Sequence, residues 1–207
     1  METIRRNKTL KMVQLALFIA IIVLMAFTPI GYIKTPGLEI TLIVVPVTVG
    51  AILLGPAAGA ILGGVFGITS FIQCFGMSPF GAALLAINPI GTFILCLIPR
   101  ILMGWLSGVC FAALKKIDKT KSISYAVANL VGPLLNTVLF MTTLVLIFYS
   151  SDYIQGMVNS LNATNPFAFA VGFVAVNGLI EMVICFVLGT AVSKTVDVVV
   201  ERTSAKQ

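Results

Sequence analysis

The sequence contains no histidine and few charged residues: Asp and Glu together number 7, and Lys and Arg 13, in 207 residues. Without histidine, the commonest general base and the commonest metal ligand are both missing. The G-x-x-x-x-G-K-[ST] phosphate loop, the H-E-x-x-H zinc motif and the G-x-S-x-G nucleophile elbow are absent as well. We therefore expect a protein that is not an enzyme, with no catalytic residue, no cofactor and no metal ion.

The few cysteines form no recognisable motif. Cys74, Cys96, Cys110 and Cys185 lie in apolar stretches and do not show the C-x-x-C spacing. They predict neither a disulfide framework nor a metal site. We interpret them as small buried hydrophobic residues.

Apolar residues, in contrast, are abundant: 59% of the chain is hydrophobic and the mean hydropathy is +1.11. No charged residue occurs between Glu39 and Arg100, or between Lys121 and Asp152. A hydrocarbon core about 30 Å thick is crossed by about 20 apolar helical residues, so these intervals hold several spans. The sequence therefore predicts an all-α polytopic membrane protein that forms a single domain over residues 1–207.

Basic residues predict how the chain is oriented. They cluster at 5–11, 115–121 and 194–206, and the positive-inside rule places all three clusters in the cytoplasm. An even number of spans must separate successive clusters, which predicts six transmembrane helices with both termini cytoplasmic, 1–11 and 195–207 being cytoplasmic segments. The net charge of +6 then reflects membrane orientation, and we expect no nucleic-acid partner. The spans are expected over 12–30, 40–55, 56–73 and 92–114, and on either side of the polar segment 150–167.

Two further segments are expected on the outer face. Residues 31–40 carry Lys34 and Glu39, and residues 74–91 are apolar but interrupted by proline, glycine and Asn88. Added to the span 92–114, the second segment would make that helix far too long for a bilayer. We therefore expect a loop that dips back onto the protein, where non-helical backbone is tolerated only if it is buried or lines a cavity.

Arg100 lies inside the apolar run 94–114. A charge at the bilayer centre costs about 3 kcal/mol on insertion scales, so an intramembrane arginine is a candidate functional residue. Two structural interpretations stay open: the side chain extends to a membrane face or caps a neighbouring carbonyl, or it forms an ion pair with Glu181.

Other polar residues share the predicted depth of Arg100. A helical rise of about 1.5 Å per residue places Arg100 roughly 22 Å above the cytoplasmic boundary at Lys115, and several further polar side chains at a similar height. Unpaired polar groups that face lipid are costly, so we expect these side chains to face inward and bind a small polar molecule. With Glu39 and Asn88 of the outer segments, the candidate substrate-binding residues are Glu39, Gln73, Asn88, Arg100, Asn136, Asn177 and Glu181.

Small residues predict close helix packing. Gly55, Gly59, Gly63 and Gly67 recur at intervals of four, and Gly104 and Gly108 do the same. This small-xxx-small pattern is typical of helices that pack closely within one chain. Ala16 and Ala20 form a similar patch near the cytoplasmic half of the first span, which could instead contact another subunit.

Four segments together resemble the substrate-binding S components of energy-coupling factor (ECF) vitamin transporters, and the similarity extends over most of the chain. The most specific elements are P-R-x-L-x-G at 99–104 and N-G-x-x-E at 177–181. The patch at Ala16 and Ala20 matches the A-x-x-x-A motif that docks on the coupling subunit in that family. The segments are "LEITLIVVPVTVGAILLGPAAGAILGGVFGITS" (38–70), "IPRILMGWLSGVCFAALKK" (98–116), "GPLLNTVLFM" (132–141) and "NGLIEMVICFVLG" (177–189).

The resemblance implies an outward-facing pocket for a water-soluble vitamin, in a multi-pass protein of a prokaryotic plasma membrane. The expected partners are a transmembrane coupling subunit and two ATPase subunits, which would hydrolyse the ATP. Pantothenate is favoured, because an arginine binds a carboxylate bidentately. Pyridoxine-like compounds, hydroxymethylpyrimidine, riboflavin and folate remain alternatives, although the expected scarcity of aromatic side chains at the site disfavours flavins. A stand-alone secondary carrier or channel, and an intramembrane enzyme, are the alternatives from other classes.

Overall fold

The computed structural model describes residues 2–29, 31–34, 39–116 and 122–204. Apart from one short hairpin, the regular structure of these residues is helical, as the sequence predicts. In chain order the elements are α1 (Glu2–Ala26), β1 (Tyr32–Lys34), β2 (Glu39–Thr41), α2 (Val44–Leu54), α3 (Pro56–Gln73), α4 (Pro79–Ile87), α5 (Pro89–Leu114), α6 (Ser122–Phe148), α7 (Asp152–Ser160) and α8 (Pro166–Ser204).

Proline in the first turn sets where several helices begin. Proline has no N–H to leave unsatisfied there, and its fixed φ suits a helix start. The residue before it caps the helix: Ser78 accepts a hydrogen bond from the Gly81 N–H at 3.4 Å, and Asn88 accepts one from the Gly91 N–H at 2.9 Å. Gly55 separates α2 from α3 with a φ of 99°, which suits glycine. The helices that begin with proline are α3 at Pro56, α4 at Pro79, α5 at Pro89 and α8 at Pro166.

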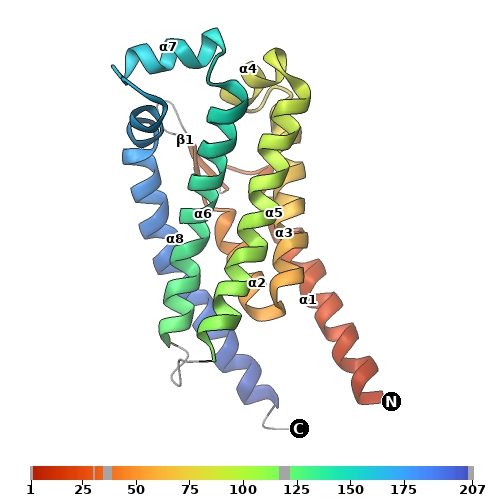
Figure 1. Cartoon of the computed structure of the whole chain (residues 1–207). Helices are drawn as coiled ribbons and strands as arrows, with labels where there is room; N and C mark the ends of the chain where they lie inside the picture. The colour runs from red at the N-terminus through yellow and green to blue at the C-terminus, as the bar shows by residue number, and fades with distance from the viewer. Residues whose placement is uncertain (1, 30, 35–38, 117–121, 205–207) are drawn as a thin grey trace.

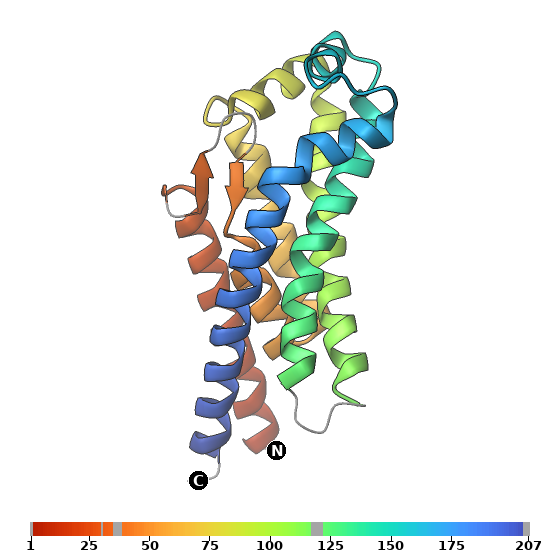
Figure 2. The ribbon, with the colours of Figure 1, turned by 90° about the vertical axis from the view of Figure 1, so that its left-hand side faces the viewer.

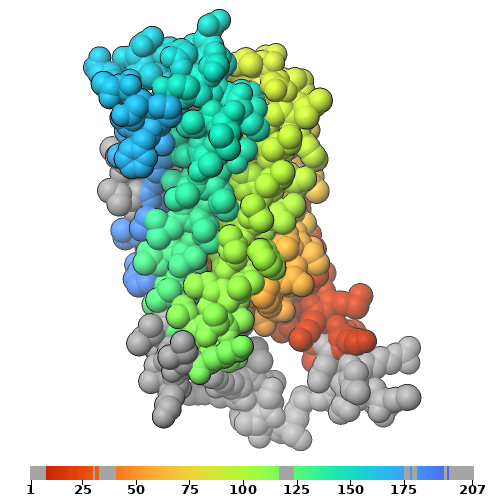
Figure 3. Space-filling model, viewed as in Figure 1, coloured from red at the N-terminus to blue at the C-terminus, as the bar shows by residue number. Residues whose placement is uncertain are grey.

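The helices form an elongated bundle with two distinct ends. The start of α1 and the end of α8 lie at the same end, whereas α4 and α7 lie across the opposite end (Figures 1 and 2). In the space-filling view, side chains of α5 and α6 run together along one face below α7 (Figure 3). We call the end that carries α4, α7 and the hairpin the hairpin end.

Glycine brings α3 and α5 into backbone contact. A β-carbon on Gly59 would collide with the Gly104 carbonyl, one on Gly63 with the Arg100 carbonyl, and one on Gly67 would lie 2.8 Å from the Cys96 carbonyl oxygen. The predicted use of the glycine stripe within the chain is thus confirmed. It fixes the backbone of Arg100 against α3.

Several predicted boundaries differ from the structure. The span expected over 40–55 is wrong at its start: residues 39–41 pair with 32–34 in an antiparallel hairpin, and α2 begins only at Val44. The segments expected as loops contain α4 and α7, and α8 continues through residues expected in the C-terminal segment.

Among the described residues, four helical segments are long and apolar enough to cross a membrane: Lys8–Ala26, Pro56–Gln73, Pro89–Leu114 and Ser124–Phe148. Two shorter apolar segments, Val44–Leu54 and Glu181–Ser193, pack beside them. This composition is that of a multi-pass membrane protein.

Two apolar cores lie on either side of the polar residues that the sequence singled out. The first joins α1, α2, α3, α5 and α8 through side chains such as Ile22, Val44 and Met103. The second joins α4, α5, α6, α7 and α8 at the hairpin end, around Leu95, Leu144 and Phe169. The space between these cores holds the site described next.

Candidate functional site

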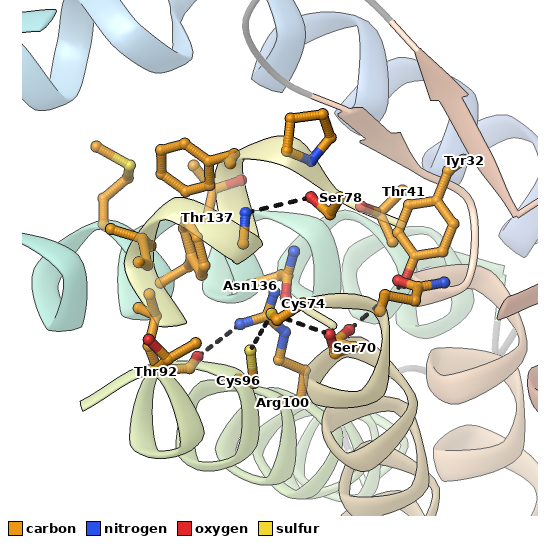
Figure 4. Close-up of a pocket in the computed structure, with 18 of the residues that line it drawn as sticks. Tyr32, Thr41, Ser70, Cys74, Ser78, Thr92, Cys96, Arg100, Asn136 and Thr137 are labelled. Carbon is orange, nitrogen blue, oxygen red and sulfur yellow. Dashed lines mark hydrogen bonds between the residues drawn. The ribbon is translucent and has the colours of Figure 1, made fainter. Parts of the chain in front are cut away.

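A cavity of about 490 Å³ opens toward the hairpin end. Small-molecule sites typically measure about 300–1,000 Å³, so its size suits a vitamin-sized ligand. Its wall combines the hairpin with residues of α3, α4, α5, α6, α7 and α8 (Figure 4). Arg100 lies in this wall, with Cys96 and Asn136 close by.

Four of the seven candidate residues line the cavity: Gln73, Arg100, Asn136 and Glu181. They come from α3, α5, α6 and α8 respectively. These four residues of the predicted polar layer therefore line one cavity in the structure.

The other three candidates are placed differently. Asn88 is exposed, does not line the cavity, and caps α5. Glu39 pairs with Lys34 in the hairpin backbone, but its side chain lies outside the described residues. The side chain of Asn177 likewise lies outside them.

The position of Arg100 follows from the proline before it. Pro99 has no N–H, so the helical hydrogen bond that would reach the Leu95 carbonyl is missing. Arg100 replaces it: Nη1 donates to the Leu95 oxygen at 2.7 Å. The guanidinium is thus held at the cavity wall by a bond that the P-R dipeptide itself creates.

Aromatic rings flank the guanidinium. The Cζ of Arg100 lies 4.7 Å from the Phe140 ring centroid and 5.5 Å from that of Phe66. A cation over aromatic faces gains about 0.5–2 kcal/mol per contact, more where water is excluded. These rings let the structure keep a charge in a largely apolar region without an adjacent carboxylate.

The possible ion pair between Arg100 and Glu181 is not formed. Within the described part of the chain, no salt bridge within 4.0 Å joins the two side chains, and the Nε of Arg100 is buried without a hydrogen-bond partner. Glu181 is only 7% exposed. Its Oε2 accepts a long hydrogen bond of 3.4 Å from the Thr41 N–H of β2, while its Oε1 has no partner among the described residues.

Asn136 of α6 lines the cavity together with Arg100 and Glu181. It is 8% exposed, its side chain is near enough to Glu181 to interact with the carboxylate, and its Oδ1 is buried without a partner among the described residues. Leaving a buried polar atom unmatched costs about 1–3 kcal/mol. Three residues of the cavity lining therefore each carry a buried polar atom without a hydrogen-bond partner among the described residues: Arg100 Nε, Asn136 Oδ1 and Glu181 Oε1.

Further hydrogen bonds tie the hairpin end to the bundle. The Tyr32 hydroxyl of β1 lies 3.4 Å from the Ser70 Oγ of α3. Gln73 donates through Nε2 to the Ala26 carbonyl at the end of α1, so its amide nitrogen is already used in joining α1 to α3. Together with the bond from Thr41 to Glu181, these contacts hold the hairpin at the mouth of the cavity.

The expectation of few aromatic side chains at the site is wrong. Four of them line the cavity: Tyr32, Phe80, Phe140 and Tyr153. Phe140 was accessible to sequence reasoning, because it lies one helical turn after Asn136 and so shares its face. Tyr32, Phe80 and Tyr153 lie in segments expected as loops, where no periodicity indicates which way a side chain points.

The predicted heights of polar residues along the helices also did not indicate a second buried polar group, which lies outside the cavity lining. Asn129 of α6 is fully buried, accepts a hydrogen bond from Thr48 of α2 at 3.2 Å, and donates to Ser193 of α8 at 3.2 Å and to the Tyr125 carbonyl at 2.8 Å. It joins three helices nearer to the end of the bundle where α8 finishes.

The cavity wall is suited to hydrogen bonding and charge recognition. Among the described residues, no three His, Cys, Asp or Glu side chains come together as metal ligands would. The charge and the buried oxygens of this wall are chemically suited to a ligand with both an anionic group and hydrogen-bond donors.

Comparison with known sequences finds a matching family model and similar proteins. A family model described as "ECF transporter, substrate-specific component" matches residues 10–193. A "Pantothenate transporter PanT" of Leuconostoc mesenteroides subsp. mesenteroides is 29% identical over 97% of this chain and 98% of its own length. A "Pantothenic acid transporter PanT" of Lactococcus lactis subsp. cremoris is 32% identical over 91% of this chain and 94% of its own length.

Proposed function

Since this chain belongs to the family of substrate-specific components of ECF transporters, we propose that it is the subunit that binds pantothenate for an ATP-driven importer. Members of this family bind a transported substrate and are not catalytic. Both relatives with near-complete coverage are named for pantothenate.

The observation that supports pantothenate most directly is the set of unmatched polar atoms in the cavity wall. Pantothenate has a carboxylate at one end and two hydroxyls and an amide toward the other. The free edge of the Arg100 guanidinium, which carries Nε, suits the carboxylate in a charge-assisted hydrogen bond. The unmatched oxygens of Asn136 and Glu181 suit hydroxyl donors.

This assignment gives each wall residue a distinct role. Arg100 would anchor the acid, and Asn136 and Glu181 would select for hydroxyls. Phe140, which stacks on the guanidinium, would supply apolar contact. Glu39 and Asn177 remain proposed contacts from the sequence, because Thr41 and Gly178 beside them in the chain line the cavity.

In the proposed transporter, this chain spans the membrane and partner subunits supply the energy from ATP. We propose six membrane-crossing segments in one domain, with both termini in the cytoplasm of a prokaryotic cell and the hairpin end outside. A transmembrane coupling subunit and two ATPases would complete the transporter. Ala16 and Ala20 are both exposed on α1, as a docking patch for the coupling subunit requires.

The direct test is ligand binding by the purified chain in lipid nanodiscs. Titration calorimetry should detect saturable binding of pantothenate and much weaker binding of pyridoxine, hydroxymethylpyrimidine, riboflavin and folate. Mass spectrometry of ligand released from freshly purified protein gives an independent identification. Tighter binding of another vitamin from this panel would refute the pantothenate assignment.

A transport assay separates the proposal from a stand-alone carrier. Proteoliposomes that contain only this chain should bind pantothenate but accumulate little. Accumulation should require the coupling subunit, the ATPases and ATP. Sustained uptake by the chain alone would instead identify a secondary carrier or channel.

A further inference from the structure

Two cysteines are in contact within the cavity wall. The Sγ atoms of Cys74, directly after α3, and Cys96, in α5, lie 3.9 Å apart. Both residues line the cavity and are 4% and 5% exposed. Figure 4 shows the two sulfurs beside the Arg100 side chain.

A disulfide between these residues requires the two sulfurs to come closer together. A disulfide holds its sulfurs about 2.05 Å apart, so the two Sγ atoms would need to move together by nearly 2 Å. The helices are already close, since a β-carbon on Gly67 would lie 2.8 Å from the Cys96 carbonyl oxygen. Disulfide formation requires that rotation of the two cysteine side chains supplies this movement.

We propose that Cys74 and Cys96 are a modification site: hydrogen peroxide that enters the cavity converts them to a disulfide, and this weakens ligand binding. One thiol loses its proton, and the resulting thiolate attacks the O–O bond of hydrogen peroxide. This gives a sulfenic acid and a hydroxide ion, which takes up that proton and leaves as the first molecule of water. The second thiol attacks that sulfenic sulfur, forms the S–S bond and releases a second water. The two sulfurs lose the two electrons that the peroxide gains, and a dithiol reductant reverses the reaction by exchange.

The disulfide would alter the wall because Cys74 contacts two elements of the site. Its Sγ donates to the Ser70 carbonyl at 3.4 Å, and Ser70 in turn contacts Tyr32 of the hairpin. A β-carbon on Gly81 would lie only 2.6 Å from the same sulfur, so α4 packs directly on it. Pulling this sulfur toward Cys96 disturbs α4 and the hairpin contact beside Arg100.

The consequence for binding rests on the proposed function, whereas formation of the cross-link does not. Under the proposed orientation the cavity opens to the outside, where oxidants are encountered and no cytoplasmic thiol pool reduces disulfides. Pantothenate in the cavity lies between the oxidant and the sulfurs, so it should slow the reaction.

The test uses the full chain in nanodiscs, fully reduced and then treated with hydrogen peroxide. Peptide mapping by mass spectrometry should find a linkage of Cys74 to Cys96, formed more slowly with pantothenate present. Pantothenate affinity should fall about tenfold, the equivalent of one hydrogen bond to a charged group, and dithiothreitol should restore it. A Cys110→Ser variant keeps the pair and should respond as the wild type does.

Cys74→Ser and Cys96→Ser provide the opposing control, each compared with its own untreated sample. Neither should lose affinity on peroxide treatment. Failure to find the cross-link, or a cross-link that leaves affinity unchanged, would overturn the inference. A reduced protein that does not bind pantothenate but still forms the linkage would instead count against the proposed function alone and show that the site reacts as inferred.

Discussion

Replacing Arg100 by lysine separates the shape of the guanidinium from its charge. In the structure, Nη1 is committed to the Leu95 carbonyl at 2.7 Å, while the edge that carries Nε has no partner among the described residues. A lysine ammonium can occupy the same region between aromatic rings and can bond the Leu95 oxygen. It cannot also present a second, coplanar donor edge to a carboxylate.

The expected loss of affinity follows from that difference. A hydrogen bond to a charged group is worth about 1.5–3 kcal/mol, so Arg100→Lys should weaken pantothenate binding roughly ten- to hundredfold. The charge and the bond to Leu95 remain available, so the melting temperature should change by no more than about 2–4 °C, the shift that 1 kcal/mol produces in a chain of this size. Titration calorimetry and thermal unfolding of the same nanodisc sample give the two quantities.

A matched control lies on the same helix. Ser107 is fully buried, donates to the Met103 carbonyl at 2.7 Å, and does not line the cavity. Ser107→Ala should leave affinity unchanged, which shows that a mild change in α5 does not by itself disturb binding. If Arg100→Lys binds pantothenate with wild-type affinity and melts as the wild type does, Arg100 only caps the Leu95 carbonyl and the reasoning is refuted.

Pro99→Ala examines how the guanidinium is oriented. Alanine restores an N–H at residue 99, which can bond the Leu95 carbonyl in the usual helical way and so competes with Arg100 Nη1. We expect thermal stability to be maintained while pantothenate affinity falls, because the guanidinium loses its fixed orientation. Unchanged affinity would mean that the bond to Leu95 does not orient Arg100 for the ligand.

Three further predictions concern orientation, coupling and packing. In a cysteine-free background, an impermeant thiol reagent added to intact cells should label a cysteine at Ser151 and spare one at Lys119; the reverse pattern would refute the proposed orientation. Leucine at Ala16 and Ala20 should abolish ATP-driven uptake but leave binding by the isolated subunit intact, since both residues are exposed; an equal loss of binding would indicate internal packing instead. Asn129→Ala should lower the free energy of unfolding by about 1–3 kcal/mol, because its hydrogen-bond partners on three helices lose their bonds; an unchanged melting temperature would contradict the importance of this network.

The sequence could predict how deep the polar residues of the candidate site lie in the membrane. The regular helical rise and the charge clusters together give a height for each polar residue, and Gln73, Arg100, Asn136 and Glu181 do line one cavity. The same arithmetic gives no information on segments without a regular period. Asn88 illustrates this limit, because a polar residue before a proline is equally suited to a binding loop and to the helix cap that it forms.

Features that depend on a partner from another helix were beyond the sequence. Cys74 and Cys96 are far apart in the sequence, where each looks like a small apolar residue of the core. Their sulfurs meet only because glycine residues let α3 pack closely on α5. The positions of Tyr32 and Thr41 could not be predicted for a similar reason: they face each other because β1 pairs with β2 in the register Tyr32↔Thr41, and hydropathy does not detect this pairing. Local pattern thus predicted the helices and their polar layer, but not the lateral contacts between them.

In the proposed binding site, the P-R dipeptide gives a local defect in a helix a role in ligand recognition. Pro99 removes a backbone donor in mid-helix, which leaves a carbonyl unmatched in an apolar region where that is costly. Arg100 satisfies the carbonyl with one edge of its guanidinium, and the close packing of Gly63 on the Arg100 carbonyl limits movement of the backbone that carries it. Only the second edge is then left for a ligand, already oriented and flanked by Phe66 and Phe140. Because the unbound protein has already restricted this side chain, little conformational entropy remains to be lost on binding, which is the property expected of a subunit whose role is to capture a scarce solute.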